Sequence, residues 1–380
     1  MPQRFAAEHA FLFTDSKTQM IDPDQLRRLQ AIGLKPALLE HLMNTVPAGA
    51  DATPMRVTEV QREGLRLHDG SAEHGARALP SLTQRLLADD DALAVGDWVL
   101  PERNAFGEWW VHTRLPPLTQ IARRLHDGRD KVTRVVIVSN VDTALLVMGL
   151  DNDFHLRRLE RYLALVRLAG VSAVVVLTKA DLCAQTAARL REAQSVVPAD
   201  VPVVALNACG DEPREALAAW LDAGRTLVML GSSGVGKSTL TNALIGHAVQ
   251  DTGGNRRGDD RGRHTTTSRS LHQALGGACI IDTPGLRTLR LDSEAGDLAA
   301  VFSDIAGLAP QCRFRDCRHE NEPGCAVREV VSAERLRSFN KLMREAQRDT
   351  ISALERKQIV SQWKARGRAA RARINAKRGA

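Results

Sequence analysis

The stretch Gly231-Ser-Ser-Gly-Val-Gly-Lys-Ser238 decides how the rest of this 380-residue chain is interpreted. It follows the apolar run Thr226-Leu-Val-Met-Leu230 and precedes Thr239-Leu-Thr-Asn-Ala-Leu-Ile245, which has the apolar spacing of a helix. A strand, a glycine-rich loop and a helix in this order bind phosphate, because backbone N–H groups and the positive end of the helix converge on one anion. The stretch therefore predicts a phosphate-binding loop for a nucleoside triphosphate; the alternative is a glycine-rich turn that matches by chance.

The positions of this loop have distinct expected roles. Gly231 and Gly236 allow a tight turn and a close approach of the backbone to phosphate. Lys237 is expected to reach the β- and γ-phosphates, and the hydroxyl of Ser238 to ligate a magnesium ion. The nucleotide contacts predicted for this segment are Gly231, Ser232, Ser233, Gly234, Val235, Gly236, Lys237, Ser238 and Thr239.

A second motif, Thr178-Lys-Ala-Asp181, indicates which base is bound. It follows the apolar run 171–177, and the carboxylate of Asp181 can accept two hydrogen bonds from N1 and N2 of guanine, a donor pair that adenine lacks. Lys179 can lay its stem along the base, and Asn207-Ala208, after the run 202–206, can offer a backbone N–H to guanine O6. Thr178 stands where GTPases most often have asparagine. These residues predict GTP and GDP as ligands.

Two further segments complete the predicted nucleotide site. Asp282-Thr-Pro-Gly285 ends an apolar run, so that Asp282 would hold Mg²⁺ through a water and the Gly285 N–H would sense the γ-phosphate. Gly262-Arg-His-Thr-Thr-Thr267 is typical of a switch that orders when the γ-phosphate is present. Since the base reader comes at 178, the phosphate loop at 231 and Asp-x-x-Gly at 282, we expect a circularly permuted GTPase domain.

The flanking segments predict a multidomain chain. Short alternating segments near residues 55–60, 64–68, 94–100 and 108–113 favour an OB-like β-barrel, although a purely structural barrel fits the pattern equally well. Apolar runs, among them 132–138 and 143–148, alternate with helical segments and predict a doubly wound α/β domain with a mainly parallel sheet. The expected division is a helical arm and linker (1–54), the barrel (55–118), the α/β domain (119–296), a helical zinc-binding domain (297–362) and a basic tail (363–380).

Four residues close together near the C-terminus predict a zinc site: Cys312, Cys317, His319 and Cys325. Three thiolates and one imidazole make a complete tetrahedral set, which is typical of structural rather than catalytic zinc. The alternative is a group of unrelated free thiols.

Charge and hydropathy bear on partners and location. The formal net charge is +7, and all charged side chains in residues 363–380 are positive. This pattern indicates either a tail that faces nucleic acid or a solvated terminus. The sequence has no apolar stretch long enough to span a bilayer and does not begin like a signal peptide. We therefore expect a cytoplasmic protein without a membrane partner.

Together these motifs resemble the RsgA/YjeQ family of circularly permuted GTPases that depend on the small ribosomal subunit. The resemblance implies an OB barrel, a permuted GTPase and a zinc domain acting on the small (30S) subunit and its rRNA late in assembly. It also implies that Thr266 is the switch threonine, sharing Mg²⁺ with Ser238. Leu286 stands where Ras-like enzymes have a water-orienting glutamine. By resemblance His264 takes that role, the alternative being packing or a phosphate contact.

The expected catalytic residues are therefore His264, Thr266 and Lys237, the cofactors GTP or GDP, Mg²⁺ and Zn²⁺, and the protein a monomer whose hydrolysis the ribosome stimulates. Two other functions stay open. One is a regulatory GTPase that acts on protein partners only. The other is a metabolic phosphate-transfer enzyme, for which the sequence offers no acceptor motif.

Overall fold

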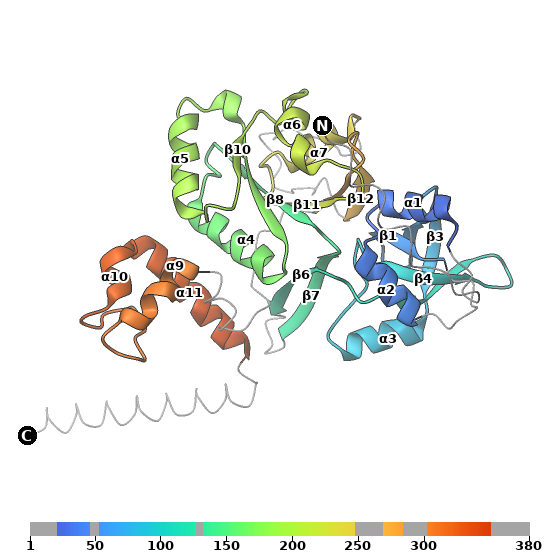
Figure 1. Cartoon of the computed structure of the whole chain (residues 1–380), viewed down its shortest axis with the longest axis horizontal. Helices are drawn as coiled ribbons and strands as arrows, with labels where there is room; N and C mark the ends of the chain where they lie inside the picture. The colour runs from blue at the N-terminus through green and yellow to red at the C-terminus, as the bar shows by residue number, and fades with distance from the viewer. Residues whose placement is uncertain (1–20, 46–52, 127–131, 248–268, 284–301, 351–380) are drawn as a thin grey trace, which may run out of the picture.

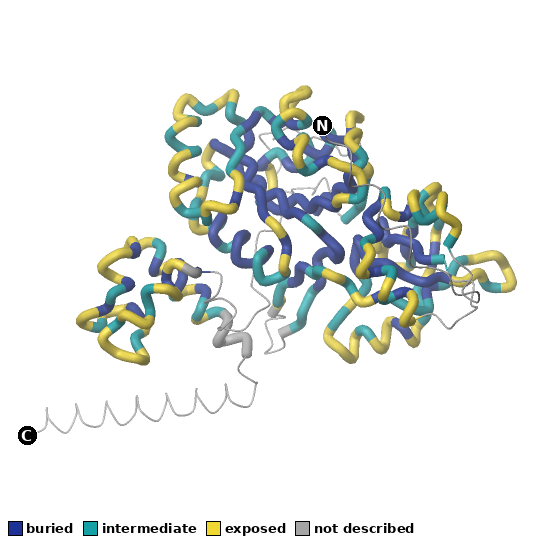
Figure 2. The backbone as a smooth tube through the Cα atoms, in the orientation of Figure 1, coloured by how far each residue is buried: buried dark blue, intermediate teal, exposed yellow. Residues whose placement is uncertain are grey.

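The computed structural model describes residues 21–45, 53–126, 132–247, 269–283 and 302–350 (Figure 1). The described residues form a β-barrel, an α/β domain and a C-terminal group of helices. Figure 2 shows that the strands of the α/β domain are buried along most of their length, whereas much of the C-terminal helices is exposed. No helix in the described ranges has the length and apolar character needed to cross a bilayer.

Five strands close the barrel. They run in the order β1-β2-β3-β5-β4, and β4 pairs back onto β1; β3 and β5 are parallel and the other pairs antiparallel. This confirms the predicted OB-like barrel. The barrel elements are β1 (Met55–Val60), β2 (Leu65–His68), β3 (Glu73–Ala78), α3 (Pro80–Ala88), β4 (Trp98–Arg103) and β5 (Trp109–Arg114).

Two N-terminal helices, α1 (Pro23–Ala31) and α2 (Pro36–Thr45), pack on the barrel. Asp22 caps α1 by accepting a hydrogen bond from the Gln25 amide, and a proline follows at the first helical position. The apolar faces of both helices join the barrel side chains in one buried cluster, which includes Leu29, Leu38, Leu42, Trp98 and Leu115. The helical spacing seen in the sequence therefore serves packing against the barrel.

The α/β domain has a six-stranded sheet in the order β10-β9-β8-β11-β13-β12, parallel except for β12. β11 lies between β8 and β13, and all its residues are buried. The last strand of this sheet, β12, also pairs with β1 at Glu59 and Ser270, so the sheet continues into the barrel. The elements are β8 (Thr143–Gly149), α4 (Leu156–Leu168), β9 (Ser172–Thr178), α5 (Thr186–Val196), β10 (Val203–Ala205), α6 (Glu212–Ala216), β11 (Thr226–Leu230), α7 (Lys237–Ile245), β12 (Ser270–Gln273) and β13 (Cys279–Asp282).

The sequence-based prediction was wrong for the run 132–138. This run forms β7 (Val132–Ser139), which pairs antiparallel with β6 (Gln120–His126) in a separate two-stranded sheet. The inner end of β7 is buried at Val136, Ile137 and Val138, so its composition resembles that of a central strand. Composition alone does not show that its hydrogen-bonding partner is a hairpin neighbour.

The C-terminal region contains α9 (Ser303–Leu308), α10 (Ala326–Val330) and α11 (Ala333–Thr350). Phe302 and Phe339 form an edge-to-face pair with ring centroids 5.2 Å apart, and their cluster continues into the core under α4. Figure 1 shows α11 beside α4. The C-terminal helices are thus packed on the α/β domain through α4.

Candidate functional site

The predicted phosphate loop connects β11 to α7 at the carboxyl end of the parallel sheet. Gly236 caps the start of α7 with φ +96°, a left-handed conformation that side chains other than glycine rarely adopt. A Cβ on Gly231 would lie 2.3 Å from the carbonyl oxygen of Val147 in β8. Glycine is required at this position because the loop leaves β11 in contact with the neighbouring strand.

Lys237 is held inside the loop it belongs to. Its Nζ donates to the carbonyl oxygens of Gly231 at 3.1 Å and Ser232 at 2.7 Å. Burial lowers the pKa of the ammonium, and the nearby carboxylates of Asp282 and Asp153 oppose that effect. The arrangement places one buried positive charge at the N-terminal end of α7, where anions are favoured.

The predicted base-reading motif lies directly against this loop. The hydroxyl of Thr178 donates to the carbonyl oxygen of Val235 at 2.6 Å. Lys179, at φ +62°, donates from Nζ to the carbonyl oxygen of Gly234 at 2.9 Å and pairs with Asp151 at 2.6 Å. Two motifs more than fifty residues apart in the chain are therefore in contact. Thr178, which replaces the asparagine most common at this position, contacts the loop through its hydroxyl.

The remaining base-reading candidates lie next to these contacts. Asp181 is exposed on the short turn Ala180–Leu182, whose Ala180 amide donates to the carbonyl oxygen of Leu206 at 3.3 Å. Ala208 is buried, and a Cβ on Gly236 would lie 3.9 Å from its Cβ. The Asn207 side chain accepts a hydrogen bond from the Cys209 amide at 2.9 Å, which fixes the turn. Asn207 and Ala208 thus follow β10 beside the phosphate loop.

Asp282 has the surroundings of a ligand for hydrated Mg²⁺. Its carboxylate is buried, and neither oxygen accepts a well-formed hydrogen bond from the described residues. Burial raises the pKa of Asp282 to about 6, against the opposing effects of Lys237 and the Thr283 amide. A buried carboxylate that lacks a well-formed hydrogen bond needs a further partner, and a metal-bound water would supply one. The half-buried Ser238 follows Lys237 in the first turn of α7, and Asp282 and Ser238 fit a Mg²⁺ site.

Three of the predicted site residues lie outside the described residues: His264, Thr266 and Gly285. Their roles in the switch, in water activation and in γ-phosphate sensing remain predictions.

The loop that follows β8 contributes to the site but was not predicted from the sequence. Asp151 in this loop forms the ion pair with Lys179, and Asp153 acts electrostatically on Lys237 while pairing with Arg158 at 2.6 Å. Their position in the sequence could have indicated this role. Acidic residues directly after a buried parallel strand lie at the same edge of the sheet as the other motifs.

The predicted zinc ligands lie together. The ligand atoms of Cys312, Cys317, His319 and Cys325 are all within 4.8 Å of one another. The Cys312 and Cys325 sulfur atoms are 3.9 Å apart, and His319 Nδ1 lies 3.4 Å from the Cys325 sulfur. Sulfur atoms bound tetrahedrally to one zinc at about 2.3 Å lie about 3.8 Å apart, so the cluster fits a four-coordinate zinc ion.

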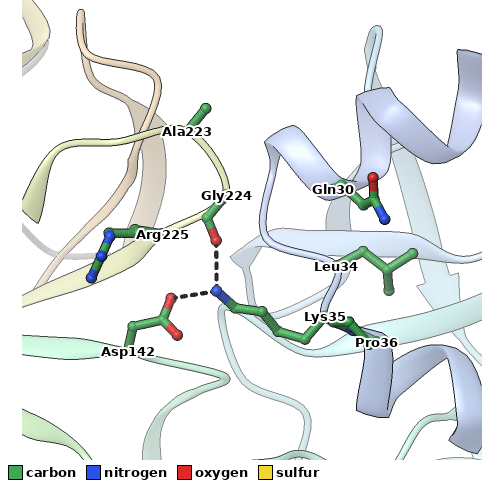
Figure 3. Close-up of a pocket in the computed structure, with 8 residues that line it drawn as sticks. All are labelled: Gln30, Leu34, Lys35, Pro36, Asp142, Ala223, Gly224 and Arg225. Atoms are coloured by element: carbon green, nitrogen blue, oxygen red, sulfur yellow. Dashed lines mark hydrogen bonds and ion pairs between the residues drawn. The ribbon is translucent and has the colours of Figure 1, made fainter. Parts of the chain in front are cut away.

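A separate cavity of about 490 Å³ lies at the opposite end of β8 and β11 (Figure 3). Lys35 points from the α1–α2 connection between Asp142, at 3.1 Å, and the carbonyl oxygen of Gly224, at 2.8 Å. Nucleotides bind outside the carboxyl ends of parallel strands. Asp142 and Gly224 instead precede β8 and β11, so the cavity lies at the amino ends of these strands. The cavity therefore marks the junction between the N-terminal helices and the α/β domain. Its lining residues are Gln30, Leu34, Lys35, Pro36, Asp142, Ala223, Gly224 and Arg225.

Comparison with solved structures confirms the fold. YjeQ from Thermotoga maritima superposes with a TM-score of 0.57 at 23% identity, over 78% of this chain and 99% of that one. YloQ, described as a circularly permuted GTPase, superposes with a TM-score of 0.53 at 22% identity, over 79% of this chain and 96% of that one.

Sequence comparison identifies the family. The family model for the RsgA GTPase matches residues 119–292. The small ribosomal subunit biogenesis GTPase RsgA of Xylella fastidiosa strain M23 is 43% identical over 298 residues, which cover 77% of this chain and 87% of the relative. The protein of the same name from Mesorhizobium japonicum is 42% identical over 309 residues, covering 79% and 86%. The chain therefore belongs to the RsgA GTPase family and is a hydrolase that acts on GTP.

Proposed function

We propose that this GTPase binds the small ribosomal subunit and hydrolyses GTP to GDP and phosphate late in subunit maturation, with hydrolysis stimulated by the subunit. Binding of a guanine nucleotide is supported by the contact of Thr178 and Lys179 with the phosphate loop, because this contact joins the proposed guanine-reading motif to the proposed phosphate site. The ribosomal part is supported by the relatives from Xylella fastidiosa and Mesorhizobium japonicum, both of which are named small ribosomal subunit biogenesis GTPases.

Within this proposal the nucleotide lies along the carboxyl edge of the sheet. Asp181 reads guanine, Lys179 lies beside the base, and the Asn207–Ala208 backbone faces guanine O6. The loop residues 231–239 hold the phosphates, with Lys237 supplying positive charge. Ser238 and Asp282 would hold Mg²⁺, which neutralises charge on the phosphates when bound.

Positioning and charge stabilisation carry most of the catalysis of phosphoryl transfer. The described residues supply both, since Lys237 is held by its own loop and the loop is held by Thr178 and Lys179. We assign water positioning to His264 and the second Mg²⁺ hydroxyl to Thr266. This division predicts slow hydrolysis by the free protein and faster hydrolysis when the ribosome fixes the switch.

The other parts of the chain have proposed roles as well. We infer that the barrel (55–118), the zinc-binding region (297–362) and the basic tail (363–380) face rRNA, while 1–54 supports the barrel and 119–296 is the GTPase domain. Structural zinc would hold the loop between α9 and α10, where the Arg313 amide donates to the Gly324 carbonyl oxygen at 3.0 Å. We further propose that the protein is a cytoplasmic monomer.

The test is steady-state hydrolysis of GTP and ATP with and without purified small subunits, at low and high salt. The proposal predicts that GTP is preferred and that small subunits accelerate its hydrolysis in a salt-sensitive manner, because phosphate contacts weaken as salt rises. If small subunits do not change the rate of GTP hydrolysis at any salt concentration, the result would favour a GTPase that acts on protein partners only. A preference for ATP would refute the base assignment.

A further inference from the structure

Lys179 connects the ends of three neighbouring strands in the α/β sheet. It follows β9, and its Nζ donates to the Gly234 carbonyl oxygen in the loop after β11 at 2.9 Å. β8 lies between β9 and β11, and the loop after β8 supplies Asp151, whose Oδ2 lies 2.6 Å from the same Nζ. The carboxylate therefore holds the lysine where it reaches from the base-reading motif to the phosphate loop.

The surroundings of Asp151 fix it as a partner for this lysine. Its second oxygen, Oδ1, accepts a hydrogen bond from the Asp153 amide at 3.0 Å. Gly149 leaves room for the carboxylate, because a Cβ at this position would lie 2.6 Å from Oδ1. Partial burial acts to raise the pKa of Asp151, but the hydrogen bonds from Lys179 and from the Asp153 amide outweigh it and hold the pKa below its usual value. The carboxylate is therefore ionised at neutral pH.

The Lys179 side chain is long and flexible, so one contact at its tip leaves much of its motion free. An ammonium has three N–H donors, and the Asp151 carboxylate and the Gly234 carbonyl accept two of them. The carboxylate is the stronger of these two acceptors because it is charged. Asp151 thus fixes the ammonium and, with it, the direction of the lysine stem.

We propose that Asp151 is a positioning residue, which holds the Lys179 ammonium so that the lysine stem covers the guanine base. The inference rests on the nucleotide site proposed above and adds one residue to it. Asp151 acts on the base through Lys179, whereas Asp181 is proposed to contact the base itself. Loss of the Asp151 charge should therefore weaken the binding of GDP and of inosine diphosphate by the same factor, because the stem covers the ring face that both bases share.

The first experiment measures the affinity for a fluorescent GDP analogue in four chains: unsubstituted, Asp151→Asn, Lys179→Met and the double substitution. Asparagine keeps the shape of the side chain without its charge, and methionine keeps an unbranched stem without an ammonium. The pair is partly exposed, with 28% of the Lys179 side chain and 44% of the Asp151 side chain accessible. We expect Asp151→Asn to weaken binding about 2- to 5-fold at low salt and less at high salt. It should have no effect in a chain that already carries Lys179→Met.

Asp200→Asn is the matched control. Asp200 pairs with Arg167 at 2.7 Å and precedes β10, at the edge of the sheet opposite the phosphate loop. The GDP affinity of this variant should equal that of the unsubstituted chain. Unchanged or tighter GDP binding in Asp151→Asn would refute the positioning role. An equal loss with and without Lys179→Met would refute action through the lysine.

The kinetics of GTP hydrolysis distinguish positioning of the base from distortion of the phosphate loop. A residue that holds the base acts equally on the ground state and the transition state. Asp151→Asn should therefore raise KM for GTP by the factor seen in the titration and leave kcat unchanged. A lower kcat with an unchanged KM would overturn the inference.

Acylation of lysines, followed by mass spectrometry of peptides, reports the contact itself. Lys179 should react faster in Asp151→Asn, whereas Lys35, paired with Asp142 at 3.1 Å, should react at its original rate. Equal reactivity of Lys179 in the two chains would contradict its restraint by Asp151. Failure of the unsubstituted chain to bind GDP would refute the nucleotide site itself, and the inference with it, whereas intact binding without these effects refutes the inference alone.

Discussion

The hydroxyl of Thr178 is the most direct link between the base reader and the phosphate loop, so removing it should weaken nucleotide binding. Valine has nearly the same shape as threonine and can occupy the same buried position. It has no hydroxyl, so Thr178→Val loses the 2.6 Å hydrogen bond to the Val235 carbonyl oxygen. A buried acceptor left without its partner costs about 1–3 kcal/mol. If most of that cost falls on the loop, affinity for GDP drops about 5- to 100-fold, since 1.4 kcal/mol is a tenfold change.

The assay is titration with a fluorescent GDP analogue, accompanied by chemical denaturation to separate affinity from global stability. Thr178→Ser should retain nearly full affinity because it keeps the hydroxyl. Thr119→Val is the matched control, since it removes a hydroxyl that donates to the Val141 carbonyl oxygen at 2.9 Å, at the end of β8 opposite the loop. Equal GDP affinities in Thr178→Val, Thr119→Val and the unsubstituted chain would show that the Thr178 contact does not hold the loop.

Three further predictions test other parts of the structure. Gly231→Ala should abolish nucleotide binding because its Cβ would lie 2.3 Å from the Val147 carbonyl oxygen, whereas Gly75→Ala, with nothing within 4 Å, should bind GDP normally in the same titration. Cys317→Ser should lower the zinc content measured by atomic absorption and expose the C-terminal region to limited proteolysis, and unchanged zinc would contradict the ligand assignment. Burial raises the pKa of Asp282 to about 6, so the folded state binds the proton more tightly than the unfolded chain and the free energy of unfolding should fall as pH rises from about 4 to about 6, by up to about 3 kcal/mol. Asp282→Asn should remove that fall in denaturation curves measured without Mg²⁺, and an unchanged pH dependence would contradict the environment described for Asp282.

The arrangement of the candidate nucleotide site could be predicted from the sequence to a large extent because each of its described motifs follows a buried strand. Once the runs ending at Leu177, Leu206, Leu230 and Ile281 are taken as parallel strands, their carboxyl ends meet at one edge of the sheet. The polar residues after them then lie close together whatever the order of the strands in the chain. The clustering of the three cysteines and His319 was predictable for another reason, since residues of these types at this short spacing are typical of a structural zinc site.

Other features required the structure because they depend on long-range pairing. β3 was not predicted, since Ala76 is its only buried residue and the strand lacks an alternating apolar pattern. β7 was assigned to the wrong sheet because the buried end of a hairpin has the same composition as a central strand. The pairing of Asp151 with Lys179 was also unpredictable, because a loop acidic residue shows no sign in the sequence of which distant lysine it contacts.

The reading of guanine by Asp181 can be tested by exchanging the donor pattern of the base. Xanthine has a carbonyl where guanine has the N2 amino group, so a carboxylate matches guanine and an asparagine amide, which can donate, matches xanthine. Competition binding of GDP and xanthosine diphosphate to the unsubstituted chain and to Asp181→Asn is therefore decisive. We predict that the unsubstituted chain prefers GDP and that Asp181→Asn prefers xanthosine diphosphate. An Asp181→Asn chain that keeps its preference for GDP would contradict a guanine pocket built from residues 178–181 and 231–239.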